Sequence, residues 1–326
     1  MPIIHLPQKD PPWIHKSSHL STILPTLLRN IDPIYTHRTR FETKDNDFFD
    51  VDICCKASNK LDQAVILLHG LEGSSHSKYI LGMAKKLCMN MDVYAMNHRG
   101  CSGEINRNIY SYHSGFTQDL KHLVEKLSPK YKQIFLIGFS LGGNILLKYL
   151  GENSRIPASV CGAVAFGVPV DLESSAFHLA KLQNRIYLQR FLRQLKNKVE
   201  QKKSAGLPIP NYDEIMKSKT FLEFDNLFTA PANGFQDSLD YWRSCSSKPL
   251  LSHICIPTLL VNPINDPFLP APCYPTIEAA QSKYFFLSTP RYGGHIGFYA
   301  GNKSYFSEDV ALYFLQNLRA CTPTSS

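Results

Sequence analysis

Mostly apolar runs of five to seven residues recur along the chain and stand between polar loops. Runs of this length without polar alternation are typical of strands that are buried on both faces of a sheet. We expect such strands at residues 64–68, 92–97, 134–139, 160–166, 257–262 and 284–288. Stretches with the apolar spacing of helices lie at residues 78–89, 116–127 and 308–318. This alternation predicts an α/β fold with a mostly parallel central sheet and helices on both faces.

The pattern changes between residues 170 and 248, where no buried-strand run occurs. The apolar residues of this segment follow helical spacing instead, so we interpret residues 170–248 as a helical cap inserted into the sheet domain. The core domain then comprises residues 1–169 and 249–326.

The chain before the first parallel strand has a different character. Residues 1–40 are rich in proline and basic residues, and we expect them to form an N-terminal extension that packs on the core. Within it, residues 18–29 predict a short helix closed by Pro25. Residues 41–53 place two short runs around acidic turn residues, which predicts an antiparallel hairpin at a sheet edge.

The most informative stretch is Gly138-Phe139-Ser140-Leu141-Gly142, between the apolar run 134–139 and a helical pattern that starts at Leu141. Strand, tight turn and helix is the context that makes Gly-x-Ser-x-Gly a nucleophile elbow, in which the serine hydroxyl is exposed on a strained turn. The competing interpretation is an ordinary glycine-rich connection in a doubly wound sheet. The flanking strand and helix favour the elbow.

A serine hydroxyl needs a base within hydrogen-bond reach, and the base needs a partner that fixes its tautomer. In a fold with an elbow serine the chain order is serine, acid, histidine. Asp266 and His295 fit this order, and each directly follows an expected strand. Taken singly, Asp266 is equally well a turn residue, and His295 could be a surface histidine. Together, their order and placement predict a Ser140–His295–Asp266 catalytic triad.

Two backbone N–H groups are candidates for an oxyanion hole. The N–H of Leu141 lies at the start of the helix after the elbow, and the N–H of Leu71 follows the strand end at His69-Gly70. His69 itself is expected to be a structural loop residue.

These motifs resemble the α/β-hydrolases, and within them the YheT-like branch of bacterial hydrolases. The resemblance covers nearly the whole chain, and the motifs that carry it are His19-Leu20-Ser21-Thr22, His69-Gly70-Leu71-Glu72-Gly73-Ser74-Ser75, Asn97-His98-Arg99-Gly100-Cys101-Ser102-Gly103-Glu104, the elbow, Asp266-Pro267-Phe268 and Gly293-Gly294-His295-Ile296-Gly297. It implies a triad at Ser140, Asp266 and His295 and carboxylesterase activity; eukaryotic members act on acylglycerols or phospholipids. The family often has two aspartates before the proline, whereas here the first is Asn265.

The net charge of +8 is concentrated in one segment. Residues 181–203 contain eight basic residues and one acidic residue, a net charge of +7. This predicted basic helix either attracts anionic membrane surfaces or is a solvated face whose charge neighbouring acids neutralise. Nucleic acid is not expected as a partner, because no recognition motif accompanies the charge.

The remaining composition indicates a cytoplasmic globular protein. No apolar run reaches the about 18 residues of a membrane span, and the N-terminus lacks a leader pattern. The nine cysteines are scattered and contain no C-x-x-C pair, which favours reduced thiols.

The leading functional hypothesis is a serine ester hydrolase that acts on a small-molecule or lipid ester without metal or organic cofactor. An acyl-enzyme that passes its acyl group to an alcohol or thiol would make it an acyltransferase. A ligand-binding protein on a hydrolase scaffold is a third hypothesis, against which an intact triad argues. No pattern in the sequence sets the oligomeric state.

Overall fold

The computed structural model describes residues 3–4, 6–8, 10–55, 61–153 and 155–320, with the backbone alone for residues 319–320. Its main feature is an eight-stranded sheet with the strand order β1-β2-β4-β3-β5-β6-β7-β8. Strands β4, β3 and β5 to β8 are parallel, whereas β1 and β2 run antiparallel at one edge. The strands are β1 (His37–Glu42), β2 (Phe48–Cys54), β3 (Gln63–Leu68), β4 (Asp92–Asn97), β5 (Gln133–Phe139), β6 (Val160–Phe166), β7 (Thr258–Val261) and β8 (Phe285–Ser288). The predicted mostly parallel sheet and the edge hairpin are confirmed.

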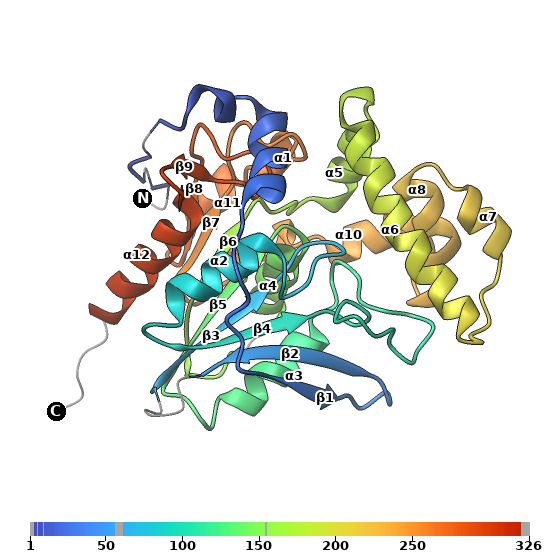
Figure 1. Ribbon diagram of the computed structural model, residues 1–326, viewed down its shortest axis with the longest axis horizontal. Helices are drawn as coiled ribbons and strands as arrows, with labels where there is room; N and C mark the ends of the chain where they lie inside the picture. Colours follow the sequence, from blue (N-terminus) through green and yellow to red (C-terminus); the bar gives the residue numbers. More distant parts are fainter. Residues whose placement is uncertain (1–2, 5, 9, 56–60, 154, 321–326) are drawn as a thin grey trace.

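Helices cover both faces of the sheet (Figure 1). Alternate residues of β3 belong to two separate hydrophobic clusters, because successive strand side chains point to opposite faces. Val65 and Leu67 pack with α2 (Lys78–Leu87) and α12 (Phe306–Ala320), and Ile66 and Leu68 pack with α3 (Gln118–Leu127) and α4 (Leu141–Glu152). Burial on both faces explains why the strands have no polar alternation.

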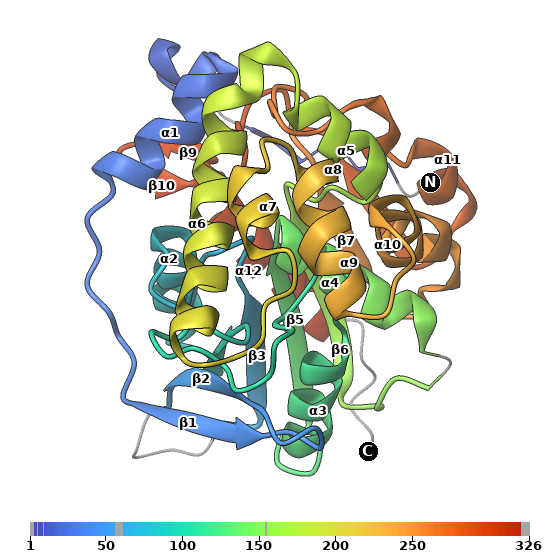
Figure 2. The ribbon, with the colours of Figure 1, turned by 90° about the vertical axis from the view of Figure 1, so that its right-hand side faces the viewer.

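The chain between β6 and β7 is helical, and Figure 2 shows these helices gathered in front of the sheet. They are α5 (Leu172–Leu179), α6 (Arg185–Ser204), α7 (Tyr212–Lys217), α8 (Phe221–Phe224), α9 (Ala230–Ala232) and α10 (Ser238–Cys245). The chain is continuously helical from α8 to α9 and includes a π-helix, η3, over Asp225–Thr229. The Ala230 N–H bonds the Asp225 carbonyl, and Pro231 has no N–H with which to continue a regular α-helical pattern.

The N-terminal extension lies against the sheet and against the site at its edge. The prediction that the first helix closes at Pro25 is wrong. Helix α1 spans Ser18–Leu28, and Pro25 lies buried inside it. Pro25 cannot donate to the carbonyl of Ser21, and that carbonyl faces Gly297, where an added Cβ would approach it to 1.9 Å. Upstream, the Ile4 N–H bonds the carbonyl of Leu287 in β8. The first turns of α1 therefore pack directly on the loop that follows β8.

Helix α11 (Thr276–Gln281) and a two-stranded sheet of β9 (Tyr299–Gly301) and β10 (Ser304–Tyr305) complete the chain. In the described residues, no helix is both long and apolar enough to cross a bilayer.

Candidate active site

Ser140 occupies a sharp turn between β5 and α4. Its backbone has φ 51° and ψ −120°, a left-handed conformation that costs free energy for a residue with a side chain. Its N–H donates to the carbonyl of Phe166 at 2.8 Å, which fixes the turn to the neighbouring strand. A Cβ at position 138 would lie 2.7 Å from the Gly143 Cα, and one at position 142 would lie 2.4 Å from the His69 carbonyl oxygen. The two flanking glycines are therefore required by the close crossing of strand, helix and loop.

His295 and Asp266 reach Ser140 from the loops after β8 and β7. His295 Nε2 lies 2.9 Å from Ser140 Oγ, and His295 Nδ1 lies 2.9 Å from Asp266 Oδ2. Asp266 Oδ1 accepts the Phe268 N–H at 2.8 Å, so both oxygens of this buried carboxylate are engaged. When Asp266 accepts a hydrogen bond from Nδ1–H, Nε2 carries no proton and is the acceptor for the serine hydroxyl. The structure thus brings together all three residues that the sequence singled out.

Three further contacts position His295, and sequence reasoning gave them no role. The Phe268 ring stacks on the imidazole with centroids 4.0 Å apart. Thr22 of α1 accepts the backbone N–H of His295 through Oγ1 at 2.8 Å. Asn265 Oδ1 accepts the N–H groups of Gly293 and Gly294 at 2.9 and 3.0 Å. Thr22 and Phe268 belong to motifs that carried the family resemblance.

Leu71 and Leu141, whose N–H groups are the predicted oxyanion donors, both line the cavity that includes Ser140. Leu141 is the first residue of α4, and Gly70 is so near that an added Cβ would be 3.2 Å from the Ser140 Cβ. Within the described residues neither N–H donates to a protein acceptor. A helix start also favours negative charge. Both groups are therefore without a protein acceptor among the residues that the structure describes, and their role in an oxyanion hole stays a prediction.

The loop that carries Leu71 is fixed by an ion pair with helix α6. Glu72 has φ 52°, and its N–H donates to the hydroxyl of Tyr112 at 2.8 Å. Its carboxylate accepts from that hydroxyl and from Lys198 Nζ, each at 2.7 Å. Burial lowers the pKa of Lys198, but nearby Cys101 and Glu72 outweigh it and raise the pKa above the ordinary value. Lys198 therefore stays charged and connects the helical segment to the loop beside Ser140.

Helix α6 is consequently not a uniformly solvated basic face. Lys198 and Lys202 point inward, and Lys202 donates to Asn106 Oδ1 at 2.8 Å and to the Asn108 carbonyl. Burial lowers the pKa of Lys202 to about 8. The exposed basic residues of this segment are Lys181, Arg185, Arg190, Arg193 and Lys203.

His69 is a buried part of the loop. Its Nε2 accepts the His98 N–H at 3.1 Å, and its Nδ1 lies 2.7 Å from the Gly70 carbonyl oxygen. Burial, with His98 nearby, holds the pKa of His69 well below its usual range. A neutral imidazole with both nitrogens engaged fits a structural residue and not a base.

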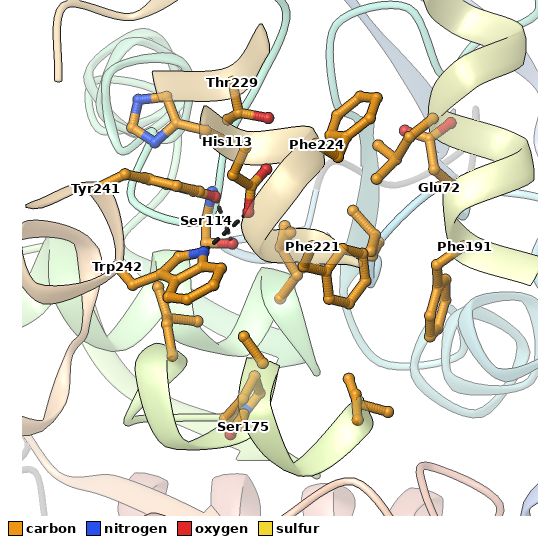
Figure 3. Close-up of a pocket in the computed structure, with 18 of the residues that line it drawn as sticks. Glu72, His113, Ser114, Ser175, Phe191, Phe221, Phe224, Thr229, Tyr241 and Trp242 are labelled. Carbon is orange, nitrogen blue, oxygen red and sulfur yellow. Dashed lines mark hydrogen bonds between the residues drawn. The ribbon is translucent and has the colours of Figure 1, made fainter. Parts of the chain in front are cut away.

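A cavity extends from Ser140 and His295 beneath the helices between β6 and β7, with about 1110 Å³ of free space including the part open to solvent. Figure 3 shows Glu72 and Phe191 on one side of it, and His113, Ser114, Tyr241 and Trp242 on the other. A second cavity reaches Ser140 and His295 past Thr22, Leu27 and Arg190. In the described part of the chain, no group of three His, Cys, Asp or Glu side chains could hold a metal ion.

A mostly parallel sheet whose elbow serine meets a histidine and an acid from the following strands defines the class of α/β-hydrolases. A family model described as "Serine aminopeptidase, S33" matches residues 59–240. The putative esterase YheT of Escherichia coli is 34% identical over 293 residues, which cover 87% of this chain and 84% of the relative. The chain therefore belongs to the YheT-like family of α/β-hydrolases, and the resemblance noted from its motifs is confirmed.

Other similar proteins agree with this placement. Human phospholipase ABHD3 is 29% identical, with 90% of this chain and 75% of the relative covered. A monoacylglycerol lipase of Saccharomyces cerevisiae is 27% identical over 72% of this chain and 54% of its own length. Among solved structures, an esterase of Pyrococcus furiosus has a TM-score of 0.56 at 18% identity, with 97% of this chain and 98% of that chain covered. The structural likeness supports the fold, and the named relatives are esterases and lipases.

Proposed function

We propose that this protein is a serine hydrolase of carboxylic esters that works through an acyl-enzyme on Ser140. The observation that carries the proposal is the hydrogen-bonded chain from Ser140 Oγ through His295 to Asp266, with 2.9 Å at each step. The relatives named esterase, phospholipase and monoacylglycerol lipase support ester bonds as the target.

In the first half-reaction Ser140 Oγ attacks the acyl carbon while His295 Nε2 takes the hydroxyl proton. Asp266 stabilises the imidazolium that forms, and the N–H groups of Leu71 and Leu141 bind the oxyanion of the tetrahedral intermediate. The intermediate collapses, His295 gives the proton to the departing alkoxide, and an alcohol leaves. Water activated by the same histidine then attacks the acyl-enzyme and releases the carboxylic acid.

Esters of graded acyl length, assayed with the wild type and Ser140→Ala, test this proposal. We expect Ser140→Ala to lose about 10³-fold or more in kcat while remaining folded. A fluorophosphonate should label the wild type at Ser140 and leave the variant unlabelled. A variant that keeps wild-type turnover, or labelling at another residue, would contradict the proposal.

Transfer of the acyl group to an alcohol is a second candidate, favoured by one relative. A Saccharomyces cerevisiae protein named medium-chain fatty acid ethyl ester synthase/esterase is 26% identical over 77% of this chain. Product analysis with a graded alcohol acceptor separates the two reactions. A transferase forms the new ester faster than it forms free acid, and a hydrolase does not.

We also propose that the mouth of the second cavity rests on anionic lipid surfaces. Helices α1 and α6 adjoin there, with His19 Nδ1 and the Tyr187 hydroxyl 3.0 Å apart. Large apolar residues are exposed on both sides: Leu28 of α1 at 74%, Ile186 of α6 at 75%, and Leu182, in the turn just before α6, at 83%. Exposed Arg185 and Arg190 stand among them. Exposed apolar side chains mixed with basic ones are typical of interfacial binding.

Cosedimentation with vesicles tests this surface. Binding to phosphatidylserine-containing vesicles should weaken with salt and fall in the double variant Leu182→Glu and Ile186→Glu, which should keep its activity on a water-soluble ester. Lys303→Glu, on an exposed turn in the chain between β9 and β10, is the matched control. Equal binding to neutral and anionic vesicles, or none, would overturn the proposal.

A further inference from the structure

One side of the cavity beneath the helices contains a buried carboxylate without a cationic partner. Asp225 is 7% exposed and lines the cavity that also contacts Ser140. Its Oδ2 accepts the indole N–H of Trp242 at 2.9 Å, and Thr229 also hydrogen-bonds to it. Among the described residues it forms no ion pair, and no positive charge influences its pKa. The buried carboxylates of Asp47 and Asp119, by contrast, are paired with Arg99.

The neighbouring polar groups do not supply a positive charge to pair with Asp225. His113 lines the same side of the cavity, and burial lowers its pKa to about 4, so it is neutral at pH 7. Lys198 lines the opposite side and is bound to Glu72. Burial raises the pKa of Asp225 to about 6, so that it is mostly ionised at neutral pH. The cavity therefore has a net negative charge at this end.

Aromatic rings surround the same space. The cavity is lined by Phe221, Phe224, Phe228, Tyr241 and Trp242. Figure 3 shows Tyr241 and Trp242 together on the side of the cavity that Ser114 and His113 also line. Aromatic faces attract ammonium groups through their quadrupole, and a desolvated carboxylate strengthens that attraction. Such a combination recognises a cation better than it recognises an alkyl chain.

Holding the tryptophan in place does not require a charge. A neutral asparagine would accept the indole N–H as well, without the cost of a desolvated carboxylate. The backbone at this point is also irregular, because Asp225 begins the π-helix Asp225–Thr229. Single π-helical turns are frequent at functional sites.

We propose that Asp225, with Trp242 and Tyr241, binds a positively charged alkylammonium group of the substrate. The inference rests on the proposed ester hydrolysis and specifies its substrate class, an ester with an ammonium group on the part that enters this cavity. The ammonium group can belong to the acyl chain or to the alcohol, and the two sources give different substrates to test.

The experiment compares each cationic ester with a neutral ester of the same shape. Choline alkanoates are paired with 3,3-dimethylbutyl alkanoates, and ω-trimethylammonio acyl esters of 4-nitrophenol are paired with their ω-tert-butyl counterparts. We expect the wild type to prefer the cationic ester in one series by about 10-fold or more in kcat/KM. Asp225→Asn should reduce that ratio to near one. Asp213→Asn, at an exposed position of α7, is the matched control and should keep the ratio.

Two outcomes would overturn the inference: equal kcat/KM for cationic and neutral esters in both series, or a preference that Asp225→Asn leaves intact. Calorimetric titration of Ser140→Ala with tetraethylammonium provides a measurement without turnover. We expect binding that weakens about 10-fold or more when Asp225→Asn is added. The two proposals can be distinguished: if neutral esters are hydrolysed and Ser140→Ala abolishes that activity, the proposed ester hydrolysis is supported even when no ammonium preference is found.

Discussion

Two buried sites, one around Arg99 at the edge of the sheet and one around Asp225 among the helices α5 to α10, handle charge in opposite ways. At the edge of the sheet, Arg99 is 2% exposed and meets three carboxylates, with two hydrogen bonds to Asp119 at 2.7 and 2.8 Å and further contacts to Asp45 and Asp47. Among the helices, Asp225 has only neutral hydrogen-bond donors. The difference indicates that the charge of Arg99 fixes a scaffold, whereas the charge of Asp225 is available to a ligand.

Removing the paired charge should have the largest effect on stability. Arg99→Met leaves Asp119 and Asp47 buried without their cation, and we expect a loss of about 3–5 kcal/mol in the free energy of unfolding. Urea denaturation measures it. Arg243→Met, which removes an exposed pair with Glu173, should cost less than about 1 kcal/mol and is the control. Similar losses for the two variants would show that the buried network has no special role.

Removing the unpaired charge should instead stabilise the protein. Burial raises the pKa of Asp225 from 3.8 to about 6, so the folded state holds this proton more tightly than the unfolded chain does. Its ionisation therefore costs stability as the pH rises from about 4 to 6, and the full cost remains at higher pH. We expect Asp225→Asn to raise the free energy of unfolding by about 1–3 kcal/mol at pH 8 and to have little effect at pH 4.

Urea denaturation at both pH values checks this prediction, with Asp213→Asn as the control. A variant that is less stable than the wild type at pH 8 would show that Asp225 is a structural acid. A stabilising substitution at a proposed binding site would agree with the general observation that functional groups are often kept at a cost in stability.

Local sequence patterns explain which parts of the fold and of the candidate site could be predicted. Strands β3 to β8 were found because residues buried on both faces leave unbroken apolar runs, and the elbow was found because its glycines have a fixed spacing. Asp266 and His295 were found because the fold dictates their order. The contacts of Thr22, Asn265 and Phe268 with the histidine and its loop were missed, because each joins segments far apart in the chain with no local pattern.

The helical segment was less predictable because the positions of its charged side chains also depend on contacts with distant parts of the chain. Its helices were expected from apolar spacing, but which basic residues of α6 point inward depends on where Glu72 and Asn106 lie in the fold. The burial of Asp225 could not be inferred either, since a lone aspartate in a helical stretch is usually exposed.

The smallest predicted effect concerns the contact that joins the two regions. Lys198 of α6 holds Glu72, and Glu72 adjoins Leu71, the proposed oxyanion donor. In the double variant Lys198→Met and Glu72→Gln no buried charge is left alone, so the fold should survive while the loop loses its ionic anchor. We expect kcat to fall about 10-fold with KM nearly unchanged, because an oxyanion donor acts mainly in the transition state.

The control is Lys196→Met, which removes only hydrogen bonds to the carbonyls of Met216 and Ser218 within the helical segment and should keep its kcat. A rise in KM without a change in kcat would place the role of this ion pair in substrate binding, and the helical segment would then act on the ester independently of the oxyanion loop.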